Sequence, residues 1–259
     1  MPELTAAAQH RPRPADPGRV ALLLAPAAAA WVLTAARMDG MAAGPGSELG
    51  DVGWFTVSWL LMMAAMMLPA VTPMVVAYSR RSTLGGATAA FAGGYLLTWA
   101  AAGLFGYAAV EGVRSLGFGF LAWDEAGRLL TAAVIAAAGV YQLTRPKSAC
   151  LRRCRDKRAF LRERWQPGRL GALRMGADHG GVCVGCCWAL MAALLALGAM
   201  NLTWMSLVAA LIAAERLLPS SGAPKRAGAL MLLALGIAVA LAPGDVPGLM
   251  VPGSGMGMP

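Results

Sequence analysis

Charged residues are scarce in this chain. Asp, Glu, Lys and Arg make up 14% of its 259 residues, whereas hydrophobic residues make up 58%. A soluble domain carries about 25% charged residues, and a soluble helix has a polar face opposite its apolar one. Here the hydrophobic residues form blocks of about 16 to 25 residues, close to the length that a helix needs to cross the hydrocarbon core. We therefore predict an integral membrane protein without a separate soluble domain.

Histidine is almost absent as well, with only His10 and His179. Two histidines are too few for a histidine-rich copper oxygenase site or for a pair of haem ligands. The chain also lacks a P-loop and a Gly-x-Gly-x-x-Gly turn after a strand, and Asp178 beside His179 does not complete a nucleophile–histidine–acid set. Nucleotide-dependent and hydrolytic enzymes are therefore disfavoured.

The net charge of +9 does not indicate a nucleic-acid partner. The basic residues lie between the hydrophobic blocks, where they set orientation or meet anionic lipid headgroups. No stretch interleaves aromatic with basic residues, as single-strand-binding surfaces do. The expected partners are therefore the lipid bilayer, a metal ion, and either a membrane-protein partner or a second copy of this chain.

The hydrophobic blocks predict an all-α, polytopic transmembrane bundle of about seven helices. The helical domain covers residues 20–242, between a disordered cytoplasmic N-terminus (1–19) and a flexible tail rich in Gly, Pro and Met (243–259). Its expected helices are 20–36, 54–78, 89–113, 127–143, 182–198, 202–218 and 227–242. The first could instead be a cleaved signal peptide, since Ala35 and Ala36 resemble a cleavage site; we prefer an uncleaved helix.

Basic residues are divided unevenly between the two sides of such a bundle. The side that holds the basic segment 144–174 receives 19 of the 22 Lys and Arg residues, and the other side receives 7 of the 13 acids. By the positive-inside rule, the N-terminus and this segment should be cytoplasmic and the C-terminus external. One acid, Glu215, falls within the sixth expected helix; intramembrane acids are functional candidates, but we predict a local pair with Arg216.

Five cysteines lie in two tight groups on the cytoplasmic side. The groups are Cys150 with Cys154, spaced i, i+4, and Cys183 with Cys186 and Cys187, spaced i, i+3, i+4. On a helix the second group would share an arc of about 100°. A reducing cytoplasm keeps thiols reduced, neighbouring basic side chains favour thiolates, and thiolates select soft metals such as Cu(I) or Zn(II). The alternative is that the cysteines pack as small apolar residues.

Other soft ligands could extend this site. His179 falls in the same arc if the helix begins before Gly180 and Gly181. The second expected helix carries methionines within an arc of about 140°, namely Met62, Met63, Met66, Met67 and Met74. A thioether binds Cu(I) without placing a charge in lipid, although Met is also a flexible core filler. Thioethers on the external side would complete a graded order toward the thiolates: Met38, Met41, Met250, Met256 and Met258.

Three motifs together resemble a bacterial family of unknown function, described as predicted metal-binding integral membrane proteins. The motifs are the methionine run from Trp59 to Pro69, the pattern Lys147-x-x-Cys150-Leu-x-x-Cys154-Arg155, and the segment from Gly181 to Met191. The resemblance covers roughly residues 54–218. It implies a bacterial cytoplasmic (inner) membrane location and metal ligands at the cysteines and the methionines of the second helix: Cys150, Cys154, Cys183, Cys186, Cys187, Met62, Met63, Met66 and Met67.

The function predicted from these features is the binding or movement of a soft metal ion, most simply Cu(I), with zinc as the other candidate. Two alternatives remain open at this point. One is a membrane thiol–disulfide oxidoreductase in which the Cys183/Cys186 pair exchanges electrons with the Cys150/Cys154 pair. The other is a structural subunit of a membrane complex in which the cysteines only pack.

Overall fold

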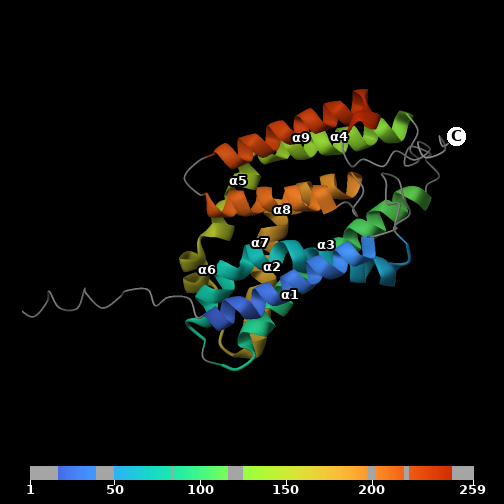
Figure 1. Cartoon of the computed structure of the whole chain (residues 1–259). Coiled ribbons are helices and arrows are strands. Elements are labelled where there is room, and N and C mark those ends of the chain that lie inside the picture. The colour runs from blue at the N-terminus through green and yellow to red at the C-terminus, as the bar shows by residue number, and fades with distance from the viewer. Residues whose placement is uncertain are drawn as a thin grey trace, which may run out of the picture.

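The described part of this computed structural model comprises residues 17–38, 50–82, 84–115, 125–197, 202–218 and 222–246. These residues form nine α-helices and a short 3₁₀ helix, with no β-strand among them (Figure 1). The elements are α1 (Pro17–Met38), α2 (Val52–Ser79), α3 (Ala87–Ser115), α4 (Glu125–Gln142), α5 (Arg145–Arg155), α6 (Lys157–Glu163), α7 (Gly168–Ala196), α8 (Leu202–Leu217), α9 (Ala223–Leu241) and η3 (Pro243–Asp245). The all-α class is confirmed for this part of the chain. The terminal residues 1–16 and 247–259, with His10, Met250, Met256 and Met258, lie outside the described residues, and so does Met41 between α1 and α2.

The prediction of about seven membrane-crossing helices is not matched. Within the described ranges, α2, α3, α7 and α9 are long and apolar enough to cross a membrane. A fifth crossing results if α4 and α5, bent by 63° at their junction, count as one broken span. Two of the predicted crossings do not reach this length among the described residues: α1 contributes the apolar stretch Leu24–Ala36, and α8 has 16 residues. The described residues therefore support four or five crossings.

The basic segment is helical, and its internal breaks have local causes. Pro146 lacks the N–H that would bond the carbonyl of Gln142, so α4 ends there, and the Thr144 hydroxyl accepts a hydrogen bond from the Lys147 N–H to start α5. Asp156 then caps α6 by accepting from the Ala159 N–H at 3.0 Å. After these two breaks, α5 packs beside α7.

Helix α7 is longer than the sequence suggested. It begins at Gly168 instead of near residue 182 and runs for 29 residues, about 43 Å. Gly180 and Gly181 lie within it without interrupting it. His179 and the three following cysteines are therefore on one continuous helix, as the proposed shared arc requires.

Close backbone contact joins α7 to α3 at the centre of the molecule. Figure 1 shows this pair beneath α8, with α4 and α9 side by side along one edge and α1 packed along α2. A Cβ at Gly176 would overlap the carbonyl oxygen of Phe91, and a Cβ at Gly94 would overlap that of Leu173. Small residues at such crossings let helix backbones approach closely, so these two glycines set the distance between α3 and α7.

Replacing Gly176 by Ala should destabilise the fold by about 1–3 kcal/mol, because the added methyl has only backbone atoms to displace. Gly181→Ala is the matched control, since nothing lies within 4 Å of its Cβ position on the same helix. There the helix propensity of Ala should raise stability by up to about 1 kcal/mol. The thermal unfolding midpoints of the two purified variants test whether the backbones of α3 and α7 meet at Gly176. A midpoint for Gly176→Ala at or above that of the control would contradict the close approach.

Candidate metal centre

Three sulfur atoms from two separate segments meet inside the molecule. The Sγ atoms of Cys154 on α5 and of Cys183 and Cys186 on α7 all lie within 4.8 Å of one another. Their residues are buried, with exposed fractions of 6%, 0% and 1%. All five cysteines are free thiols. The α4–α5 break and the length of α7 together bring these positions into contact across about thirty residues of chain.

The group has the dimensions of a soft-metal site. Three sulfurs bound to one ion at about 2.3 Å would lie about 4 Å apart, so the observed separations need little adjustment. A fourth donor is at hand, because His179 Nε2 lies 3.9 Å from Cys154 Sγ. The other ring nitrogen of His179, Nδ1, is buried and has no hydrogen-bond partner. Three sulfurs suit Cu(I), while three sulfurs with an imidazole would also suit tetrahedral Zn(II).

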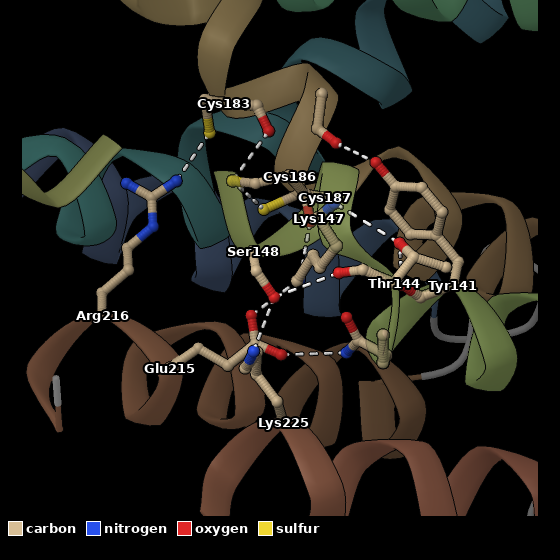
Figure 2. A network of polar contacts seen from close by, with 12 residues as sticks. Tyr141, Thr144, Lys147, Ser148, Cys183, Cys186, Cys187, Glu215, Arg216 and Lys225 are labelled. Carbon is tan, nitrogen blue, oxygen red and sulfur yellow. Dashed lines mark hydrogen bonds and ion pairs between the residues drawn. The ribbon is translucent and has the colours of Figure 1, made fainter. Parts of the chain in front are cut away.

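A cation faces this group of thiols directly. Arg216 Nη2 donates to Cys183 Sγ at 2.7 Å, while Nη1 donates to the Ala70 carbonyl of α2 at 3.1 Å (Figure 2). Tyr95 Oη on α3 lies 3.0 Å from the same sulfur. A guanidinium beside a thiol stabilises the thiolate form, and thiolate is the form that binds metal. Cys183 is therefore the sulfur most strongly prepared as a ligand.

A buried ion pair lies behind the thiols and holds their helix in place. Lys147 Nζ lies 2.7 Å from Glu215 Oε2 and donates to the Cys186 carbonyl at 2.6 Å. Gln142 Nε2 donates to the other carboxylate oxygen at 2.9 Å. Figure 2 shows Glu215 and Arg216 leaving α8 toward different partners. The predicted local pair between these neighbours is thus wrong: consecutive helix residues point about 100° apart.

Two of the predicted cysteine ligands lie beside the group of three. Cys187 is buried, and its sulfur is 3.4 Å from that of Cys186. Cys150 is half-buried, and its sulfur packs against Gly185, where an added Cβ would lie 3.1 Å away. The oxidoreductase alternative, which joins Cys150 and Cys154 in one relay pair, gains no support from this arrangement.

The methionines of α2 divide into two sets. Met62, Met63, Met66 and Met67 are all buried, and Met63 and Met67 are fully enclosed in the core. Met66 and Met74 also line a cavity of about 560 Å³, whereas Met62, Met63 and Met67 do not line it. The same cavity reaches Cys154, His179 and Arg216. Only part of the methionine arc therefore adjoins the thiols.

Sequence reasoning missed Tyr95, and it named Lys147 only as a motif residue and Arg216 only as a partner for Glu215. Lys147 is one of eleven basic residues in segment 144–174, and nothing local distinguishes it from the exposed ones. Arg216 did leave a signal, because it ends an otherwise apolar helix next to an acid. Charges in such places mark functional candidates.

Replacing Lys147 by Met should cost about 3–5 kcal/mol of unfolding free energy, because Glu215 would stay buried without its cation. The double variant Lys147→Met/Glu215→Gln should recover most of that loss, since no uncompensated charge remains. The exposed pair of Arg114 with Glu111 provides the control, and Arg114→Gln should cost at most about 1 kcal/mol. Unfolding curves of the four proteins measure this. Equal destabilisation by the single and double variants would show that the ion pair is not what matters.

Comparison with known proteins agrees with this chemistry. Residues 56–239, most of the chain, match the PpoB2 family, whose description is copper chaperone. No curated protein matches the chain, and no solved structure does. The matched region contains all five cysteines, His179 and Arg216. The chain therefore belongs to the PpoB2 copper chaperone family.

Proposed function

We propose that this chain is a membrane-embedded chaperone for Cu(I), which it holds between Cys154, Cys183 and Cys186. The observation that carries the proposal is the meeting of these three buried sulfurs from α5 and α7. A chaperone must bind its cargo tightly and still release it. Three neighbouring thiolates allow both, because Cu(I) can exchange one sulfur ligand at a time while the other two hold it.

The charges around the site bear on which ion it holds. Thiolates in a buried site are costly without compensation, and Arg216 supplies one positive charge at Cys183. Lys147 adds none in net, because Glu215 balances it. With Arg216 and three thiolates, Cu(I) leaves one negative charge and Zn(II) leaves none, so the donor set of three sulfurs, and not the charge, favours Cu(I). Zn(II) with His179 as the fourth ligand is the competing occupant.

The exterior of the molecule supports placing it in a bilayer. Large apolar side chains are exposed on several helices, including Phe105 and Leu241 at 78% each and Leu230 at 68%. Lipid would cover these side chains, which lie on helices long and apolar enough to cross a membrane. The basic segment 144–174 would then lie on the cytoplasmic side, with the thiols close beneath it.

Purified under anaerobic, copper-replete conditions, the protein should contain about one Cu(I) per chain, a stoichiometry expected from one group of three sulfurs. Cys183→Ser and Cys186→Ser should each lose most of it, whereas Cys150→Ser, at the sulfur outside the group, should retain it. Elemental analysis and competition with a Cu(I) chelator provide the measurement.

The possible results separate the candidates. Zinc in place of copper, lost on His179→Gln, would identify the Cys₃His alternative. A wild-type protein without bound metal would refute the proposal and leave packing as the role of the cysteines.

Cys150 offers a test of orientation, since it is the one half-exposed cysteine. A membrane-impermeant thiol reagent should not modify it in intact cells but should do so after lysis, because the basic segment faces the cytoplasm. Cys150→Ser is the control that assigns the label. Labelling of Cys150 in intact cells would reverse the proposed topology.

A further inference from the structure

The cavity beside the thiols connects the surface with the metal site. Its rim includes the exposed residues Pro69, Pro73 and Leu217, and its buried floor includes Cys154 and His179. Its volume of about 560 Å³ falls in the range of small-molecule sites. A ligand at the rim could therefore reach a sulfur of the group of three without unfolding any helix.

The charges along this cavity are all positive. Arg155, Lys157 and Arg216 line it, and none of the described residues that line it is acidic. Like charges repel an approaching free cation, while a cleft of one sign concentrates ions of the opposite sign. A port for bare Cu(I) would be expected to carry carboxylates or only neutral ligands. This cavity instead suits a copper complex with net negative charge.

Soft neutral donors lie deeper in the same cavity. Met66 and Met74 line it from one face of α2, and the unpartnered Nδ1 of His179 belongs to a residue on its wall. Thioether and imidazole both bind Cu(I), but each binds it more weakly than a thiolate does. Cu(I) that arrives here would thus move on to Cys154.

We propose that this cavity is the loading port of the chaperone and that it accepts Cu(I) as an anionic complex with small-molecule thiolates. This inference rests on the proposed function, since it presumes that the three sulfurs bind Cu(I). Arg155 and Lys157 attract the complex to the rim. Met66 and Met74 receive the ion on its way to Cys154 and the two cysteines of α7.

The transfer is a ligand exchange without redox change. The Met66 and Met74 thioethers displace one donor thiolate from Cu(I), and Cys154 displaces the next. Each Cu–S bond broken on the donor is replaced by a Cu–S bond to this chain. Cys183, held as a thiolate beside Arg216, gives up no proton. The thiol protons of Cys154 and Cys186 pass to the two departing donor thiolates, and no electron is transferred. The ion therefore remains Cu(I) throughout.

The first test measures the rate at which the full chain takes Cu(I) from the Cu(I)–glutathione complex under anaerobic conditions. Met66→Leu/Met74→Leu should load about tenfold more slowly, which equals roughly 1.4 kcal/mol in the limiting step, with unchanged final stoichiometry. Met63→Leu/Met67→Leu is the matched control: the same exchange on the same helix, at core positions off the cavity. Equal loading rates in the two double variants would refute the proposal that Cu(I) enters through this cavity.

The second test addresses charge selection. Arg155→Gln/Lys157→Gln should slow loading from Cu(I)–glutathione severalfold but not from the cationic tetrakis(acetonitrile)copper(I). Arg158→Gln/Arg162→Gln, which removes two exposed cations of α6 that do not line the cavity, should leave both rates unchanged. Equal slowing with both donors would refute an anionic substrate. A wild-type chain that binds no Cu(I) at all would instead refute the chaperone function itself.

Discussion

The buried pair of Lys147 and Glu215 is the interaction on which the site depends. It joins α5 to α8, and the same ammonium group donates to the carbonyl of Cys186 on α7. Gln142 adds α4 through the second carboxylate oxygen. Replacing a buried ion pair with apolar residues often stabilises a protein. We therefore infer that this pair serves to orient the helices and not to add stability. It fixes the rotation of α5 and thereby aims Cys154 at the thiols of α7.

Arg216 performs a different task from its neighbour on α8. A metal site built of thiolates in a poorly solvated interior needs positive charge nearby, because water cannot supply the compensation. The guanidinium meets that need at Cys183 and is itself held by the Ala70 carbonyl. Because Arg216 also lines the cavity, anything that enters this cavity toward the thiols passes beside a fixed charge. Binding, charge compensation and access are therefore combined at one residue.

The apolar helices could be predicted from the sequence within a few residues, since uninterrupted hydrophobic blocks mark them directly. Prediction failed between residues 144 and 182, where basic residues concealed three helical pieces that only Thr144, Pro146 and Asp156 delimit locally. The meeting of Cys154 with Cys183 and Cys186 was a reasonable hypothesis from spacing. That Cys150 faces Gly185 could not be foreseen, because this depends on how α5 is turned after the break at Pro146. Burial of Lys147 depends on the same tertiary arrangement.

The glycine-mediated contact between α3 and α7 limits how the protein can move. Where one backbone rests directly on another, there is no layer of side chains to rearrange, so the two helices behave as a single stiff strut. Cys183 and Cys186 belong to that strut. Any rearrangement at the three sulfurs must therefore move Cys154 of α5 relative to this strut, since the two sulfurs of α7 share it.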